Sequence, residues 1–365
     1  MNTAPERIGG ELPGLLFGRA PINVYWEMTS ACDLACRHCR ANAQTDPVDG
    51  ELSTDEGKSL IESVGRLGSM LVLTGGDPMK RPDLWELIEH ARARHIPIAV
   101  TPAITPLLTR DDVVRFKELG VTAMGVSLDG PDPAVHDGFR QVEGTFERSM
   151  QALRWAREVE LPVQVNTSVT TDTLPHLKAM YRLLSTEAAP PVKRWSLFLL
   201  VPVGRGLELG VPSADEVEEL FSWVYEVAED APFRVGTTEA PHYRRYWIER
   251  KRAEGMSLEE IGRRAGRMAF GVRDGNGVVF VSCRGEIYPA GFLPEPLLGN
   301  VKEVALDEVY PNAPALRVLR DPEQYKGRCG RCDYKFACGG SRARAFGMQH
   351  DMLADDPLCA YQPPA

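Results

Sequence analysis

Six short β-rich runs alternate with longer amphipathic segments between residues 22 and 201, and this alternation restricts the fold most strongly. The expected strands cover residues 22–28, 69–74, 96–101, 121–127, 161–169 and 194–201. Between them, Ser53 followed by Glu56 and Thr109 followed by Asp112 form capping boxes that begin helices. Several strands are apolar throughout, as strands covered on both faces must be. The pattern predicts an α/β fold, either a βα barrel or a doubly wound parallel sheet, with functional residues at the C-terminal ends of strands.

With 365 residues, 43% of them hydrophobic and 25% charged, the chain has the composition of a soluble globular protein. Its N-terminus lacks a basic-then-apolar signal, and no apolar run approaches the roughly 18 residues of a membrane span. We therefore expect a cytoplasmic protein without membrane contact, in which clustered cysteines are metal ligands or redox groups rather than disulfides. The net charge of -9 argues against nucleic acid as a partner and favours a small-molecule or peptide substrate.

Three of the eight cysteines, Cys32, Cys36 and Cys39, directly follow the first expected strand. A closed structural zinc or iron site uses four protein ligands, whereas three thiolates leave a metal or cluster with an open position, as a catalytic site requires. The alternative is a zinc site or a redox pair that a distant cysteine completes. Spacing alone leaves both interpretations open.

The spacing C-x-x-x-C-x-H-C resembles the signature of the radical S-adenosylmethionine (SAM) enzymes, and further motifs follow in the order of that family. They are LTGGDP (73–78), VSLDG (126–130), HDGFR (136–140) and VNTSVT (165–170). Asp77 stands where the family usually has Glu. The resemblance covers about residues 20–205. It implies a partial (β/α)6 TIM-like barrel in which Cys32, Cys36 and Cys39 hold a 4Fe-4S cluster that binds SAM.

The resemblance also implies which residues contact SAM. Two glycines remove side chains where the backbone approaches the methionine part, polar residues at strand ends bond the ribose or the carboxylate, and a histidine replaces the aromatic residue beside the adenine. The implied cofactor-binding residues are His38, Gly75, Gly76, Asp77, Ser127, Asp129 and Asn166. Without the resemblance, the Gly-Gly and Asp-Gly pairs read as turns, Asn166 as a strand cap and His38 as a packing residue.

Four further cysteines lie near the C-terminus and make up a complete ligand set. They are Cys329, Cys332 and Cys338, spaced C-x2-C-x5-C, and Cys359. Four thiolates suit zinc as well as an iron-sulfur cluster, so spacing does not choose between them. The segment resembles the SPASM or shortened twitch extension of radical SAM enzymes, which implies one auxiliary 4Fe-4S cluster beside the SAM-binding one.

Cys283 matches the first cysteine of the two-cluster SPASM pattern, but the other ligands of that cluster are missing. Ala290 stands where a Tyr-Pro-Cys cysteine usually falls, and the cysteine expected after Gly299 is absent. Ser341 likewise takes a place where relatives from heme pathways often carry a cysteine. We therefore expect a single auxiliary cluster, with Cys283 as a buried packing residue, a free thiol or a substrate-facing group.

Within the superfamily, WEMTSACDLACRHCRA and SRARAFGMQHDMLADDPLCAYQP resemble enzymes of alternative heme and heme d1 synthesis. That resemblance implies reductive cleavage of SAM to a 5'-deoxyadenosyl radical, with an electron from a flavodoxin or ferredoxin. The radical then oxidatively modifies or decarboxylates a carboxylate-bearing substrate such as a tetrapyrrole. A radical SAM peptide maturase is the first alternative, although only about twenty residues precede the first strand, too few for a leader-binding domain. A non-catalytic iron-sulfur or zinc-binding protein is the distant alternative.

We expect four segments along the chain. They are an N-terminal tail (1–20), the barrel (21–205), a helical linking segment that completes the substrate side (206–275) and the auxiliary-cluster domain (276–365). Residues 236–267 concentrate arginine and aromatic side chains in an acidic protein, and arginine holds carboxylates through paired hydrogen bonds. The candidate substrate residues are His242, Tyr243, Arg244 and Arg245. The basic run at 250–252 reads equally well as a solvated helix face.

Overall fold

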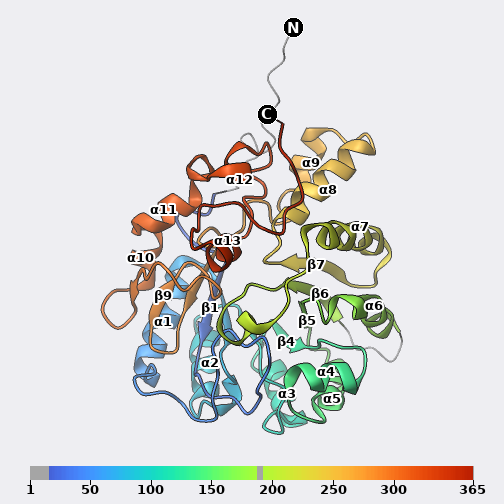
Figure 1. Cartoon of the computed structure of the whole chain (residues 1–365). Coiled ribbons are helices and arrows are strands. Elements are labelled where there is room, and N and C mark those ends of the chain that lie inside the picture. Colours follow the sequence, from blue (N-terminus) through green and yellow to red (C-terminus); the bar gives the residue numbers. More distant parts are fainter. Residues whose placement is uncertain (1–15, 187–191, 365) are drawn as a thin grey trace.

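A single ten-stranded sheet runs through the part of the chain that the computed structural model describes, residues 16–186 and 192–364 (Figure 1). The strand order is β10-β9-β8-β1-β2-β3-β4-β5-β6-β7. Neighbouring strands from β8 to β7 pair in parallel, whereas β9 and β10 are antiparallel additions beyond β8. Because β10 and β7 form the two edges, the barrel is open.

The six expected strands are all present, with ends that differ from the prediction by a few residues. The strands are β1 (Asn23–Glu27), β2 (Met70–Thr74), β3 (Ile98–Val100), β4 (Ala123–Ser127), β5 (Val163–Val169), β6 (Val192–Leu199), β7 (Arg234–Thr238), β8 (Val278–Val281), β9 (Glu286–Tyr288) and β10 (Gly299–Asn300). Strands β7 to β10 were not predicted, because β7 contains a central glycine and the others are very short. The predicted partial βα barrel is confirmed, with β8 extending it beyond β1.

Figure 1 shows α1 to α7 following one another along the outside of the sheet. The helices are α1 (Thr54–Leu67), α2 (Leu84–Ala93), α3 (Arg110–Glu118), α4 (Pro133–Arg140), α5 (Thr145–Glu158), α6 (Leu177–Ser185), α7 (Ala214–Asp230), α8 (His242–Ala253), α9 (Leu258–Arg264), α10 (Leu306–Asn312), α11 (Pro314–Arg320), α12 (Gly327–Arg331) and α13 (Arg342–Gln349). Ser53 and Thr109 form the predicted capping boxes at α1 and α3.

The two faces of the sheet differ in polarity. Trp26 and Trp195 are fully buried on the outer face, where Trp26 packs against α1 and Trp195 contacts aromatic rings of α6 and α7. On β5 every second residue is only partly buried, and these residues, Gln164, Asn166 and Ser168, point to the inner face. A strand with one apolar and one polar face fits a sheet that encloses a polar interior.

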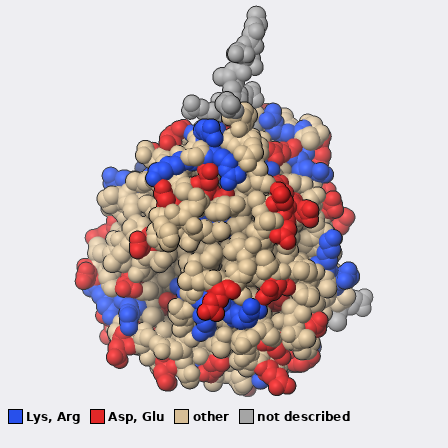
Figure 2. Space-filling model, in the orientation of Figure 1, with Lys and Arg blue, Asp and Glu red and all other residues tan. Residues whose placement is uncertain are grey.

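The C-terminal cysteines lie in a layer formed by α12, α13 and the segments around them, beside α8 (Figure 1). On the face of the molecule in Figure 2, acidic and basic side chains are intermixed around the periphery, and the centre is mostly uncharged. No helix among the described residues is long and apolar enough to cross a membrane.

Candidate metal centres and active site

The loop after β1 brings Cys32, Cys36 and Cys39 together at the C-terminal end of the parallel sheet. Each of the three sulfur atoms accepts an N–H hydrogen bond. The donors are Leu34 N to Cys32 at 3.4 Å, Ala43 N to Cys39 at 3.4 Å and Arg140 Nη1 to Cys36 at 3.5 Å. Donors that face sulfur atoms stabilise the thiolate form in which cysteine binds iron. The three thiols therefore have the surroundings of metal ligands.

Arg205, in the segment after β6, holds this loop in place. Its Nε donates to the carbonyl oxygen of Cys36 at 2.9 Å, and its Nη1 donates to that of Ala43 at 3.1 Å. Gly204 lies so close to the loop that a Cβ there would be 2.5 Å from the Cys39 carbonyl oxygen. The sequence analysis did not assign Arg205 a role. In the sequence, Arg205 is an arginine between two glycines after a strand. This pattern indicates no function unless its contact with the cysteine loop is known.

Gly75 and Gly76 lie against the backbone of the cysteine loop, where larger residues would not fit. A Cβ on Gly76 would lie 2.3 Å from the carbonyl oxygen of Ala31, and Gly75 adopts a positive φ of 150°. Asp77 continues the contact, because its backbone N–H donates to Ala31 O at 2.6 Å. The glycines thus let the end of β2 pack directly against the backbone that carries the cysteines.

The side chain of Asp77, a predicted cofactor-binding residue, makes its contacts within the protein. The carboxylate is fully buried and accepts hydrogen bonds from Met79 N, Ala103 N and the Thr105 hydroxyl at 3.0 to 3.2 Å. Burial raises its pKa to about 6. Asp77 therefore connects the loops after β2 and β3.

The side chain of Asp129, another predicted cofactor-binding residue, also has its partners within the protein. Its carboxylate is 1% exposed and is shared by the Arg140 guanidinium and the Ser168 N–H. Burial alone would raise the pKa of Asp129, but Arg140 holds it below its usual value. His136 Nδ1 accepts the Asp129 N–H at 3.0 Å. Asp129 therefore orients Arg140, whose other nitrogen reaches Cys36.

His38, Ser127 and Asn166 remain accessible near the cysteine loop. The His38 ring stacks on Phe139 at 4.8 Å, and burial and the nearby Arg140 lower its pKa to about 3, so the ring is neutral. Ser127 lines a small pocket with His136 and Arg140, and Asn166 points to the inner face of the sheet. Among the described residues, His38 Nδ1 and Arg205 Nη2 are buried without a hydrogen-bond partner.

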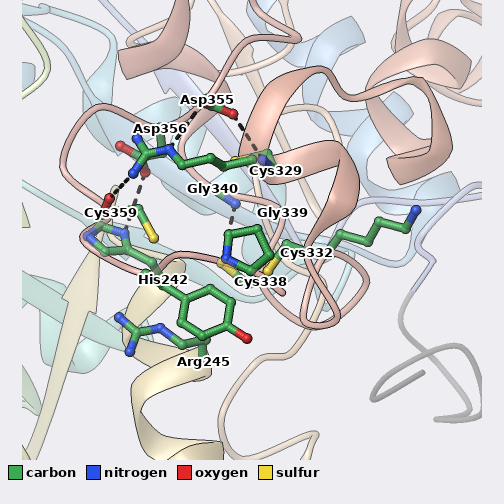
Figure 3. A pocket seen from close by; sticks show the side chains of 14 residues that line it. His242, Arg245, Cys329, Cys332, Cys338, Gly339, Gly340, Asp355, Asp356 and Cys359 are labelled. Atoms are coloured by element: carbon green, nitrogen blue, oxygen red, sulfur yellow. Dashed lines mark hydrogen bonds and ion pairs between the residues drawn. The ribbon is translucent and has the colours of Figure 1, made fainter. Parts of the chain in front are cut away.

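The four C-terminal cysteines surround one pocket, together with His242 and Arg245 from α8 (Figure 3). All four sulfur atoms have an N–H neighbour. The donors are Arg342 Nη2 to Cys329 at 3.6 Å, Tyr334 N to Cys332 at 3.4 Å, Gly340 N to Cys338 at 3.3 Å and Tyr361 N to Cys359. This donor pattern matches that of the first three cysteines.

The C-terminal thiols line a single pocket. In the described parts of the chain, no three His, Cys, Asp or Glu side chains converge closely enough to hold a single metal ion. The pocket between them has a volume of about 430 Å³, solvent at its mouth included. Arg245 Nε is buried beside it without a partner. Cys283 does not line this pocket; its neighbours are Glu27 and Glu51.

Three of the four predicted substrate residues are not available to a substrate. His242 is fully buried and lies 3.4 Å from the Asp356 carboxylate, and Tyr243 is 5% exposed and packs against Phe221. Arg245 is 4% exposed and pairs with Glu218 and Glu249. The first turn of α8 faces the hydrophobic core and the C-terminal cysteines on most sides, which gives these three side chains partners within the protein. Arg244 alone remains partly accessible.

Comparison with known proteins gives consistent results for sequence and fold. Residues 26–184 match the profile of the Radical SAM superfamily. An AdoMet-dependent heme synthase from Oleidesulfovibrio alaskensis is 40% identical over 93% of this chain and 87% of that protein. A pre-heme d1 synthase from Dinoroseobacter shibae is 28% identical over 95% of this chain and 88% of that protein. The fold resembles Streptococcus suis SuiB bound to S-adenosylmethionine, with a TM-score of 0.74 at 15% identity over 94% of this chain and 78% of that one.

Proposed function

The chain belongs to the radical SAM superfamily, and from that premise we propose that it uses SAM to oxidise a carboxylate-bearing side chain of a tetrapyrrole. It is a radical SAM enzyme, with a 4Fe-4S cluster and SAM as cofactors. The observation that carries the proposal is the 40% identity to a heme synthase along almost the whole of both chains. That similarity favours a tetrapyrrole over the alternative peptide substrate and over a non-catalytic role.

We assign Cys32, Cys36 and Cys39 as ligands of the SAM-binding cluster, because the structure surrounds each sulfur with an N–H donor. Cys32, Cys36 and Cys39 would hold the cluster, which would supply the electron for reductive cleavage of SAM and so the radical chemistry that removes a hydrogen atom from the substrate. Arg205 and Arg140 fix the loop and neutralise negative charge at the cysteines. Gly75, Gly76, Ser127, Asn166 and His38 form the SAM surface; the unpartnered His38 Nδ1 and Arg205 Nη2 fit a polar ligand there.

We further assign an auxiliary 4Fe-4S cluster to Cys329, Cys332, Cys338 and Cys359. The four thiols line one pocket, and Arg245 provides an unpartnered donor beside it. Hydrogen removal followed by loss of CO2 turns a propionate into a vinyl group and leaves one electron. A cluster held by Cys329, Cys332, Cys338 and Cys359 would supply an acceptor for that electron.

The test is an anaerobic assay of the reconstituted full-length enzyme with SAM, a flavodoxin or ferredoxin as the proposed electron donor, and an iron porphyrin that carries propionates. We expect 5'-deoxyadenosine to form together with a porphyrin product that has lost CO2. Equal 5'-deoxyadenosine with and without porphyrin, and no change in porphyrin mass, would exclude this substrate class. A short peptide in the same assay tests the alternative.

A further inference from the structure

Four polar side chains from distant parts of the chain lie within electrostatic range of one another. Tyr25 lies on β1, Arg194 on β6, Glu239 directly after β7 and Arg244 in the first turn of α8. Arg194 interacts electrostatically with Tyr25 and Arg244, and Tyr25 with Glu239. Four strands separate β1 from β6 in the sheet, so Tyr25 and Arg194 can meet only across the interior.

Arg194 points to that interior. It pairs in register with Gln164, on the polar face of β5, whereas the next residue, Trp195, is buried under the helices. Its guanidinium lies over β7, where a Cβ on Gly236 would be 3.0 Å from Nη2. The side chain is accessible to solvent, yet burial lowers its pKa.

The Arg194 guanidinium has no hydrogen bond or ion pair with another of the described residues. Arg244 is nearly as free, because its only such contact is a long one from Nη1 to the carbonyl oxygen of Ala337 at 3.4 Å. Burial lowers the pKa of Arg244 to about 10, with Cys338, Arg273 and Arg194 among its neighbours. Arg244 therefore lies between the interior of the barrel and the C-terminal cysteines.

Glu239, the acidic group in this set, does not neutralise the two arginines. Its carboxyl accepts the Ser341 hydroxyl hydrogen at 2.6 Å and is coupled to the buried Asp274. Burial and the nearby Asp274 raise the pKa of Glu239 well above its usual value, so the pair retains a proton at neutral pH. Among the described residues no carboxylate forms an ion pair with Arg194 or Arg244, so these two guanidinium groups can hold an anion.

We propose that Arg194 and Arg244 bind a carboxylate of the substrate on the inner face of the barrel, beside the C-terminal cysteines, with the Tyr25 hydroxyl as a further donor. This inference rests on the proposed function, which supplies the ligand class: the propionate side chain of a tetrapyrrole. It replaces the predicted pair of Arg244 and Arg245, because Glu218 and Glu249 already occupy Arg245. A guanidinium offers a carboxylate two parallel hydrogen bonds, so the site selects both charge and shape.

The test compares iron coproporphyrin III with its methyl ester, in which the carboxylates are blocked, by absorbance titration of the full-length iron-loaded enzyme. We expect the wild type to bind the acid at least tenfold more tightly than the ester. Arg194→Gln and Arg244→Gln should weaken binding of the acid at least tenfold, with Arg194→Lys intermediate. Lys193→Gln is the matched control, since it removes an exposed charge from the adjacent residue of the same strand. Iron content and melting temperature equal to those of the control verify folding.

The outcomes separate this site from the proposed function. Tight binding of the acid by the Arg194 and Arg244 variants, or equal binding of acid and ester by the wild type, overturns the site and leaves a tetrapyrrole substrate standing. A second outcome is that the wild type does not bind the porphyrin but binds a peptide with a free C-terminal carboxylate more tightly than the peptide amide. If Arg194→Gln abolishes that preference, the carboxylate site is supported and the tetrapyrrole substrate is wrong. Binding of neither acid overturns both.

Discussion

Replacing Arg342 should lower the reduction potential of the C-terminal centre. Arg342 is fully buried, and its Nη2 lies 3.6 Å from the sulfur of Cys329. A positive charge at this place stabilises the reduced, more negative form of a cluster. Arg342→Gln removes the charge and retains a hydrogen-bond donor, whereas Arg342→Lys retains the charge.

The size of the effect follows from the distance. At an effective dielectric constant of about 20, a unit charge 3.6 Å from the sulfur contributes about 5 kcal/mol. The added electron spreads over a whole cluster, so we expect Arg342 to stabilise the reduced form by about half of this energy, ~2 kcal/mol. For one electron this corresponds to a shift of about 90 mV in the reduction potential. Arg342 also donates to the carbonyl oxygens of Met352 and Ala354, so the lysine variant separates loss of charge from loss of these bonds.

The assay is a redox titration followed by EPR in a protein whose Cys32, Cys36 and Cys39 are replaced by Ala, so that only the C-terminal centre contributes. Arg331→Gln is the matched control: it removes an exposed charge beside Cys332, which water screens. An unchanged potential in Arg342→Gln with full iron content, or a shift as large in the Arg331 control, would refute the reasoning.

Three other changes test separate parts of the structure. Cys283→Ala should retain the full iron content, since Cys283 lies outside the pocket of the other cysteines; loss of about four irons per chain would make it a ligand. Gly76→Ala should reduce SAM cleavage and lower the melting temperature, because its Cβ would lie 2.3 Å from Ala31 O and displace the cysteine loop; wild-type cleavage would contradict this. Burial lowers the pKa of His136 to about 4, so between pH 6.5 and pH 4 the unfolded chain binds a proton at this residue and the folded chain does not. The neutral His136 therefore contributes to the free energy of unfolding at neutral pH, and this contribution is lost as pH falls from 6.5 towards 4. His136→Gln should remove about 2 kcal/mol of the stability difference between pH 7 and pH 5 in denaturant titrations, and an unaltered pH dependence would argue against a neutral buried His136.

The parts of this protein that depend on local sequence could be predicted. The strands follow from apolar runs, and the starts of α1 and α3 follow from Ser53 and Thr109, whose side chains bond only three residues ahead. The cysteine spacing identified both thiol sets, because ligands on one loop converge whatever the rest of the chain does. The four missed strands are short or interrupted by glycine, so they owe their conformation to the neighbouring strand rather than to their own residues.

Residue roles that depend on distant partners could not be predicted. Asp129 and Asn166 are both polar residues at strand ends, but only the structure reveals that Arg140 takes the carboxylate of Asp129, whereas the amide oxygen of Asn166 accepts a hydrogen bond from Gln164. Arg244 and Arg245 are adjacent in sequence, yet they point in different directions from α8. Arg245 contacts Glu218, 27 residues away, whereas Arg244 points toward the barrel. Arg194 was missed because a single arginine in a strand gives no sign of the face it occupies until the register is known.

The central claim, that Cys32, Cys36 and Cys39 form the centre that cleaves SAM, is tested most directly by replacing all three with Ala. Anaerobic assays with a strong reductant should then yield no 5'-deoxyadenosine. The variant should keep about four of about eight irons per chain, held by the C-terminal cysteines. Formation of 5'-deoxyadenosine at the wild-type rate by the triple variant would contradict the account.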